Sequence, residues 1–464
     1  MRIVMFYHSL LSDWNHGNAH FLRGVATELL ARGHAVSVYE PRDSWSVENL
    51  VREHGPKPLE DFRAAYPSLK STRYDLRKLD LDTALAGADL VIVHEWSDHE
   101  LVRRIGTHRA RTGRYRLLFH DTHHRCVTEP ESMAAYDLTH YDGVLAFGNV
   151  IRDLYRERGW ARDAWTWHEA ADTRVFRPFH GARREGDLVW VGNWGDEERT
   201  AELHEFLLEP AKTLGLKARV HGVRYPAHAR KALANAGIEY GGWLPNYEAP
   251  EVFARYRVTV HVPRRPYVKN LPGIPTIRPF EALACGIPLI CSPWDDAEGL
   301  FTPGKDYLVA RTGAEMTRHL WTLLNDEEQR RELAIHGRRT ILARHTCGHR
   351  VEQLLSIYAE LEKRPKAVAV RGKSARAKAL AAPVAGANDA TPAAGTGLGR
   401  LLPLAAGLVP AAVLALAVRN RLRAARSAVP PAGPEPGTTD TAPSDGGPQS
   451  LAPDLAPRTP EAGE

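Results

Sequence analysis

The chain has 464 residues, which is too many for one hydrophobic core and enough for two domains and an appendage. The segment from Pro365 onward carries eleven Lys/Arg and seven Asp/Glu, so it supplies four of the five net positive charges. The first 364 residues are therefore close to neutral, and their charge gives no indication of a nucleic-acid partner.

The cysteine pattern and the first residues bear on the cellular compartment. The four cysteines form no C-x-x-C pair and no His/Cys spacing typical of a metal site, which indicates free thiols in a reducing cytosol. The opening run MRIVMFYH lacks the long apolar stretch of a signal peptide and predicts a first strand. We expect a cytoplasmic protein. The cysteines are Cys126, Cys285, Cys291 and Cys347.

The opening segment predicts a doubly wound domain. A strand over 2–7, a polar loop, an amphipathic helix over 21–33 and a strand over 34–40 follow one another. The loop ends with Gly17, which lets the backbone approach a ligand closely, and Asn18, which can cap the helix. A ligand-binding loop and an ordinary capped turn both remain open. No G-x-G-x-x-G motif occurs, so we expect no dinucleotide cofactor.

Polar side chains gather where three further strands end. These strands are predicted over 89–95, 116–124 and 143–148, and ligands of open α/β sheets bind at such strand ends. His120 and Asp121 are the catalytic candidates, because a histidine of near-neutral pKa can bind a substrate hydroxyl or move its proton. We expect no metal here, because the run of His and Asp lies along one strand and its loop.

A second domain follows a border at 165–179 and a polar linker at 180–187. The run LVWVGNWGDEER opens a second sheet, with a Gly192-Asn193 turn into a helix over 197–214. Two further strands are predicted within 217–226 and 238–246. The sequence thus predicts domains at 1–178 and 184–346.

The segment 275–288, PTIRPFEALACGIP, predicts a short helix between two strands at 257–263 and 288–291. Thr276 can cap its start, and Gly286 can take the left-handed conformation that ends it. In such a βαβ unit the helix N-terminus lies over the carboxyl edge of the sheet and favours phosphate. Arg278 could hold a diphosphate, and Glu281 could accept hydrogen bonds from sugar hydroxyls.

This segment carries a resemblance to a known family. The runs FEALACGIPLI and LFTPGKDYLVA resemble the donor-binding segment of GT-B glycosyltransferases, and more narrowly the spore maturation protein CgeB group, related to the family 4 retaining enzymes. Glu281 matches the second Glu of the family's E-x7-E motif, which binds the donor's ribose, whereas the first Glu is replaced by Gly273. The resemblance implies an α/β protein with two Rossmann-like domains facing across a cleft.

The resemblance also implies a function. It implies transfer of a sugar from a nucleotide-diphospho-sugar to a glycan, lipid or protein acceptor, without metal or cofactor and with retention of configuration. His120 matches the family's active-site histidine, and the GGWLPN turn implies a base-side wall of Trp243, Leu244 and Pro245. The donor-binding candidates are Glu281, Arg278, Thr276, Gly273, Gly17, Asn18, Gly192, Asn193, Arg264 and Lys269. The candidates for the family's basic residues in the first loop of the second domain are Arg199, Arg224, Arg264, Arg265 and Lys269.

The C-terminal part divides into helices and a tail. Two helical patterns end near 364; the resemblance implies that the one at 347–364 crosses back onto the first domain, and two ordinary surface helices are the alternative. From 365 to 464 the composition predicts a disordered tail, interrupted by one short apolar helix at 401–418. Its length is at the lower edge for a membrane span, so we expect peripheral contact with the inner membrane face through 400–426, or a partner-binding helix.

Two other functions fit the same residues. A GT-B fold can also carry a nucleotide-sugar epimerase. A non-catalytic scaffold of an envelope or surface assembly is the second alternative, because Gly273 and the missing basic residues depart from the family pattern.

Overall fold

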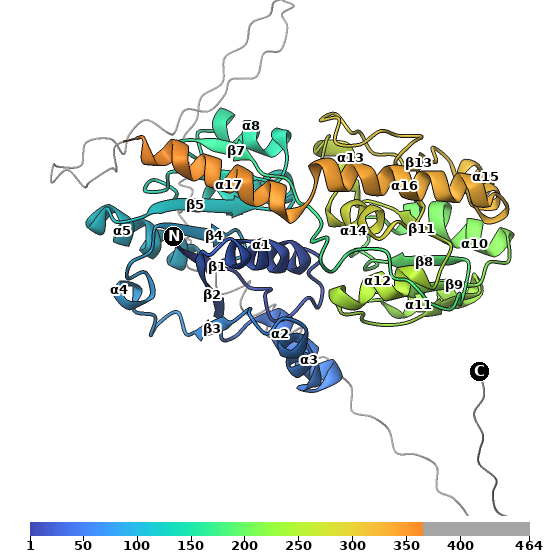
Figure 1. The fold of residues 1–464 in the computed structure, drawn as a ribbon, viewed down its shortest axis with the longest axis horizontal. Helices are drawn as coiled ribbons and strands as arrows, with labels where there is room; N and C mark the ends of the chain where they lie inside the picture. Colours follow the sequence, from blue (N-terminus) through green and yellow to red (C-terminus); the bar gives the residue numbers. More distant parts are fainter. Residues whose placement is uncertain (365–464) are drawn as a thin grey trace, which may run out of the picture. The chain divides into compact units, whose positions relative to one another are not determined.

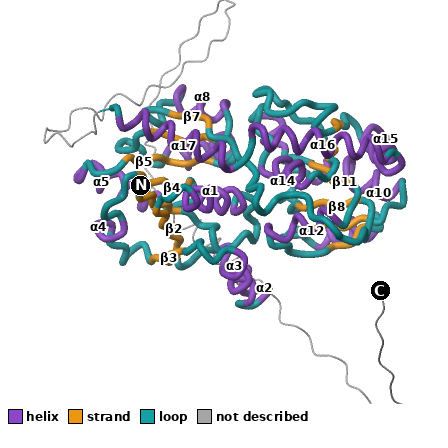
Figure 2. The backbone as a smooth tube through the Cα atoms, in the orientation of Figure 1, coloured by secondary structure: helices purple, strands orange, loops and turns teal. Residues whose placement is uncertain are grey.

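The computed structural model of the protein describes residues 1–364. The predicted tail at 365–464, its apolar segment 401–418 and the predicted membrane contact through 400–426 lie outside the described residues. The described chain forms two α/β domains, each with a parallel sheet between helices (Figures 1 and 2). No helix within residues 1–364 is both long enough and apolar enough to cross a membrane.

The first sheet has seven parallel strands in the order β3-β2-β1-β4-β5-β6-β7. The edge strand β3 falls in the charged stretch before residue 82 and was not predicted, because its sequence STRY is polar and mostly half-exposed. The strands are β1 (Arg2–Phe6), β2 (Ala35–Pro41), β3 (Ser71–Tyr74), β4 (Leu90–His94), β5 (Arg116–Asp121), β6 (Gly143–Ala146) and β7 (Ala164–Thr166).

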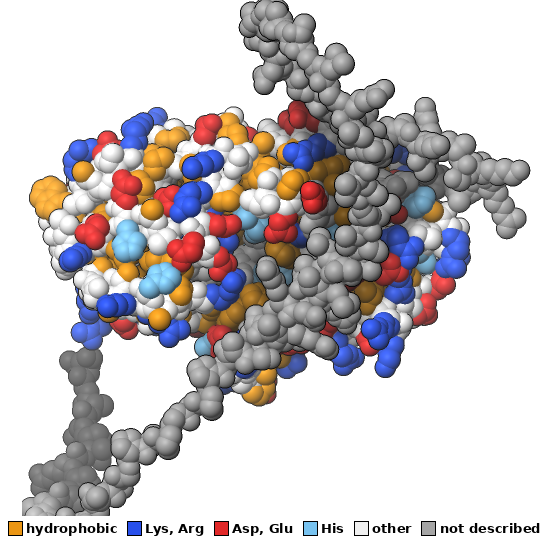
Figure 3. Space-filling view, turned by 180° about the vertical axis from the view of Figure 1, so that it is seen from behind, with side chains coloured by type: hydrophobic (Ala, Val, Ile, Leu, Met, Phe, Trp, Pro, Cys, Tyr) orange, Lys and Arg blue, Asp and Glu red, His pale blue; other side chains and the backbone are white. Residues whose placement is uncertain are grey.

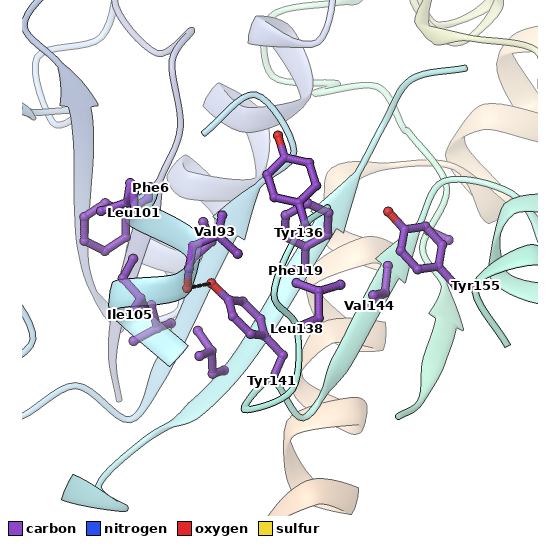
Figure 4. Close-up of a cluster of buried hydrophobic side chains, with 14 of the residues drawn as sticks. Phe6, Val93, Leu101, Ile105, Phe119, Tyr136, Leu138, Tyr141, Val144 and Tyr155 are labelled. Carbon is purple, nitrogen blue, oxygen red and sulfur yellow. Dashed lines mark hydrogen bonds between the residues drawn. The ribbon is translucent and has the colours of Figure 1, made fainter. Parts of the chain in front are cut away.

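Helices cover both faces of this sheet. Alternate residues of β1 enter separate clusters of buried side chains, with Val4 and Phe6 in one and Ile3 and Met5 in the other. The first cluster includes α5 and α8; Figure 4 shows part of it, where the Tyr141 hydroxyl donates a 3.0 Å hydrogen bond to a backbone carbonyl. The second includes α1 and α17, so the last described helix packs on the first domain (Figure 1). The helices here are α1 (Ala19–Ala31), α2 (Trp45–His54), α3 (Lys57–Ala65), α4 (Leu81–Ala84), α5 (His99–Thr112), α6 (Arg125–Thr128), α7 (Pro130–Ala134), α8 (Asn149–Glu157) and α17 (Cys347–Glu362).

The second sheet has six parallel strands in the order β10-β9-β8-β11-β12-β13. Both sheets therefore share the Rossmann-like arrangement in which the chain reverses direction beside the first strand of the domain. The strands are β8 (Leu188–Val191), β9 (Ala218–His221), β10 (Ile238–Tyr240), β11 (Val258–His261), β12 (Leu289–Cys291) and β13 (Leu308–Val309).

The helices of the second domain differ from expectation at one place. The single helix expected over 197–214 is divided by a π-helical turn, η1 (His204–Leu208). Pro210, which follows this turn, has no backbone N–H and therefore cannot donate a helical hydrogen bond. The other helices are α9 (Thr200–Leu203), α10 (Glu209–Thr213), α11 (Ala227–Asn235), the 3-10 turn η2 (Asn246–Glu248), α12 (Ala249–Ala254), α13 (Arg265–Asn270), α14 (Ile277–Cys285), α15 (Gly313–Asn325) and α16 (Glu327–Arg344).

The surface agrees with the near-neutral charge of residues 1–364. On the part of Figure 3 that the grey atoms leave visible, basic and acidic side chains are interspersed. This visible face is therefore one of mixed charge.

His120 and Asp121 lie beneath the carboxyl edge of the first sheet and not at its surface. His120 is 1% exposed, and a 2.7 Å hydrogen bond joins its Nδ1 to the Tyr7 hydroxyl. Asp121 accepts from the Tyr155 hydroxyl at 2.9 Å and the His123 N–H at 3.1 Å. Burial raises the pKa of Asp121 to about 6, and burial together with the charge of Asp121 raises the pKa of Glu95 well above its usual range.

The close packing of α1 on α17 can be tested at Gly24. A Cβ at this position would lie 2.5 Å from Cys347 Sγ and 2.8 Å from Asp172 Cβ. Helix propensity alone would make Gly24→Ala stabilising by about 1 kcal/mol. Because overpacking costs about 1–3 kcal/mol, we expect a net loss of unfolding free energy in urea denaturation, and a smaller loss in a Cys347→Ala background. A gain in stability would contradict this packing.

The buried carboxyl of Asp121 predicts a pH dependence. Its pKa is about 6 in the folded state against a usual 3.8, so between these pH values the folded chain holds a proton that the unfolded chain has released. Ionisation of the Asp121 carboxyl therefore lowers the free energy of unfolding as pH rises from 3.8 to about 6. We expect the unfolding free energy of Asp121→Asn, relative to wild type, to rise by about 3 kcal/mol at most between pH 4 and pH 7.

Urea denaturation at a series of pH values checks this prediction. Asp137→Asn, at an exposed position of the same domain, is the matched control. If the difference in unfolding free energy between Asp121→Asn and wild type stays constant over the whole pH range, the prediction is contradicted.

Candidate active site

The helix α14 begins and ends where the sequence predicted. Gly286 has the left-handed conformation at its end, with φ of 69°. Thr276 precedes its first residue but makes no side-chain cap, so that part of the expectation is wrong. Its φ of 60° and ψ of −179° are uncommon for a β-branched residue, and strain of this kind clusters at ligand sites. Its Oγ1 lies 3.4 Å from His261 Nε2.

Three adjoining cavities run from the N-terminus of α14 into the first domain. The first cavity, about 200 Å³, is lined by the loop after β1 and by the carboxyl edge of the second sheet. The second cavity, about 650 Å³, shares a wall with the first at His16, His123, Arg264 and Tyr267. The third cavity, about 1000 Å³, adjoins the second at His8 and Trp96. The two domains therefore enclose a continuous cleft.

Three guanidinium groups line the first cavity. Arg264 pairs with Glu198 at 2.9 Å, and Arg278 pairs with Glu281. Arg199 donates to two backbone carbonyls at 2.6 and 2.5 Å and forms no salt bridge with any residue up to 364. Burial, and then the charge of Arg264, lower the pKa of Arg199 to about 9. An anion bound among these groups would relieve that repulsion.

Of the five basic candidates, only Arg199 lies in the first loop of the second domain, and the other four follow later strands. Arg224 lines the second cavity. Arg265 pairs with Glu202 at 2.7 Å and, like Lys269, lines none of the three cavities. Two neighbouring arginines, Arg264 and Arg265, thus differ in whether they reach the cleft.

Most of the predicted donor-binding residues meet at the first cavity. The close approach of the two domains explains one of them: a Cβ at Gly17 would lie 2.9 Å from Ile277 of α14, so only glycine lets the loop come this near. The predicted residues that line this cavity are Gly17, Asn18, Gly192, Asn193, Arg264, Thr276, Arg278, Trp243 and Leu244. Those that line none of the three cavities are Glu281, Gly273, Lys269, Pro245, His120 and Asp121.

Glu281 lies behind the cavity wall and not in it. Its carboxylate is 0% exposed and accepts a 2.8 Å hydrogen bond from His20 Nδ1, while Arg278 holds its other oxygen. The Asp172 N–H donates to His20 Nε2 at 2.8 Å, so the proton of this imidazole lies on Nδ1. Phe176 stacks on the His20 ring with centroids 3.8 Å apart.

Gly273, where the family has its first Glu, has no room for a side chain. Its φ is +86°, and a Cβ would meet Glu298 Cγ at 2.6 Å. The Glu298 carboxylate accepts from the Asn149 N–H at 2.6 Å and lies 2.7 Å from His168 Nε2. A carboxylate from a later loop therefore stands next to the missing position and bridges the two domains, which no local sequence signal could have shown.

Two histidines reach the cleft in place of His120. His16 and His123 line both the first and the second cavity. His16 lies in the polar loop before the predicted helix 21–33, and His123 lies in the predicted strand 116–124. Burial lowers the pKa of His16 to about 4, so its imidazole is neutral at pH 7 and offers one ring nitrogen as a hydrogen-bond acceptor. Its Nδ1 lies 3.3 Å from His8 Nε2. Among the described residues, no group of three or more His, Cys, Asp or Glu side chains is arranged to hold a metal ion.

Comparison with known proteins agrees with this geometry. Residues 199–356 match a family model described as glycosyl transferase-like. A search of curated proteins finds no match.

Solved structures match over both domains. Sucrose-phosphate synthase from Thermosynechococcus elongatus is 14% identical, with a TM-score of 0.54, and the match covers 78% of this chain and 99% of that one. A glycosyltransferase from Rickettsia africae is 11% identical, with a TM-score of 0.54 and coverage of 78% and 99%. HepE from Anabaena, solved with UDP-glucose, is 12% identical, with a TM-score of 0.55 and coverage of 78% and 100%. Residues 1–364 thus have the GT-B fold, and residues 199–356 within them are similar to the glycosyl transferase-like family.

Proposed function

We propose that this protein is a glycosyltransferase that transfers a sugar from a nucleotide-diphospho-sugar to an acceptor, without a metal and with retention of configuration. The observation that carries the proposal is the convergence of Arg199, Arg264 and Arg278 on the N-terminus of α14 in one cavity. The glycosyl transferase-like match over 199–356 and the GT-B fold support the reaction class. That HepE was solved with UDP-glucose supports a nucleotide-sugar donor.

The first cavity would bind the donor's nucleotide and diphosphate. The free N–H groups and partial positive charge at the start of α14, together with the three guanidinium groups, would stabilise the negative charge on the departing diphosphate. Trp243 and Leu244 would flank the base. The sugar would then point into the second cavity, where His16 and His123 lie. A neutral imidazole there would hydrogen-bond the donor sugar or the attacking hydroxyl, which is the binding role first expected for His120.

Membership of the CgeB group and kinship with the family 4 enzymes form part of the proposal. The ribose contact of Glu281 stays a prediction. The contacts of Glu281 support a positioning role, because its carboxylate holds the guanidinium of Arg278 at the cavity wall and joins it to His20.

The donor site can be tested by thermal shift of the full chain against nucleoside diphosphates and nucleotide-sugars. A ligand that binds only the folded state must raise the melting temperature. We expect one nucleotide to do so, and Arg264→Ala to weaken its affinity about 10- to 100-fold, since a hydrogen bond to a charged group is worth about 1.5–3 kcal/mol. Arg265→Ala is the matched control and should leave the affinity unchanged, because Arg265 faces Glu202 outside the cleft.

Other outcomes would favour the alternatives. If no nucleotide shifts the melting temperature, the scaffold hypothesis gains over the enzyme. If nucleotide-sugar is bound and its sugar is epimerised with no acceptor present, the epimerase hypothesis gains. Equal weakening by Arg264→Ala and Arg265→Ala would contradict the assignment of the first cavity.

A further inference from the structure

The second and third cavities extend the cleft well beyond a donor site. The first and third cavities share no lining residue, and each adjoins the second, so the order along the cleft is fixed. Ligand sites usually measure about 300–1,000 Å³, and the third cavity alone reaches the top of that range. A donor bound at the α14 end would leave this space free for a large second substrate.

Two exposed tryptophans line this part of the cleft. Trp45 and Trp96 are 47% and 42% exposed, and both line the second cavity. The His16 ring lies near both, with centroid distances of 6.3 Å to Trp45 and 6.5 Å to Trp96. Trp96 also lines the third cavity. Large exposed aromatic side chains in a cavity mark a binding surface, since leaving them in water costs free energy.

The Trp96 ring is held in place before any ligand arrives. The Arg125 guanidinium lies 4.6 Å from the ring centroid. Arg125 is itself fixed by hydrogen bonds to the Glu95 carbonyl at 3.2 Å and to Ser132 Oγ at 2.9 Å. A ring fixed in this way loses little conformational entropy when a ligand stacks on its open part.

Polar groups of both signs surround the aromatic rings. Arg42 and Arg77 line the third cavity together with Asp43 and Glu48. Neither Asp43 nor Glu48 forms a salt bridge with another of the described residues, so both carboxylates can accept hydrogen bonds from a ligand. A wall of mixed charge does not suit an acyl chain, because an acyl chain needs an apolar wall. It does not suit a polyanion either, because a polyanion needs a basic wall. A ring with one apolar face and a rim of hydroxyl groups, which is the chemistry of a saccharide, fits such a wall.

We propose that the second and third cavities bind the acceptor as a saccharide chain of two or more rings, with one ring stacked on Trp96. The inference rests on the proposed function, because it assigns the other end of the cleft to the donor. The terminal hydroxyl of the saccharide then meets the donor sugar in the second cavity, beside His16 and His123. Trp45 also lines that cavity.

The test measures saccharide binding and nucleotide binding separately, on the full chain. Saturation-transfer NMR is recorded with neutral saccharides of one to three rings, with the nucleotide that gives the largest thermal shift present. We expect at least one oligosaccharide to bind. Trp96→Ala should weaken its affinity tenfold or more, while Trp96→Phe keeps it within about threefold, since a phenyl ring preserves the stacking surface. Trp321→Ala, at a 58% exposed site on α15, is the matched control and should change nothing.

The outcomes separate the two proposals. If a nucleotide raises the melting temperature but no saccharide binds, or if Trp96→Ala binds saccharide as wild type does, the acceptor inference is overturned and the donor site stands. If no nucleotide binds yet an oligosaccharide binds through Trp96, the saccharide site stands and the transferase proposal fails. Trp96→Ala must keep the nucleotide-induced shift of wild type. If Trp96→Phe loses saccharide binding to the same extent as Trp96→Ala, the stacking role is overturned.

Discussion

The arrangement of the two domains depends on a buried carboxylate. Glu281 lies at the domain junction with no exposed surface, and an unpaired charge there would cost several kcal/mol. The second domain supplies one partner, Arg278, and the first supplies the other, His20. Because His20 also accepts from the Asp172 N–H, its ring is held at both nitrogens. Helix α1 and helix α14 are thereby fixed against each other at the junction beside the first cavity.

The loop between β1 and α1 joins this junction to the cleft. Asp13 accepts from Trp243 Nε1 and from the Asn246 N–H, both at 3.0 Å, and pairs with Arg23 at 2.8 Å. Contacts with both domains therefore stabilise this loop, although it is part of the first domain. Its later residues, including Gly17, form a wall of the first cavity as a direct consequence. A change that loosened the junction would disturb the donor end of the cleft even if it touched no ligand.

How much could be predicted from the sequence depended on whether a feature was local. The end of α14 was predictable, because Gly286 can take a left-handed conformation that most residues avoid, whereas the cap expected from Thr276 does not form. The buried strands were predictable from apolar runs, whereas polar β3 was not. That His120 and Glu281 are buried outside the cleft was not predictable, because burial depends on contacts distant in sequence. Tyr7 covers the first residue and His20 the second, and neither contact leaves a local pattern.

The charge balance of the first cavity supports the proposal that it would stabilise a departing diphosphate. Its three guanidinium groups face two carboxylates, Glu198 and Glu281, and the start of α14 adds about half a positive charge, leaving roughly +1.5. The diphosphate of a nucleotide-sugar carries two negative charges and gains a third as the bond to the sugar breaks. Arg199, which has no carboxylate partner among residues 1–364, is the group best able to respond to that third charge. Under the proposed function, a field of this size would hold the transition state more strongly than the donor, which is the condition for accelerating the reaction and not merely binding its substrate.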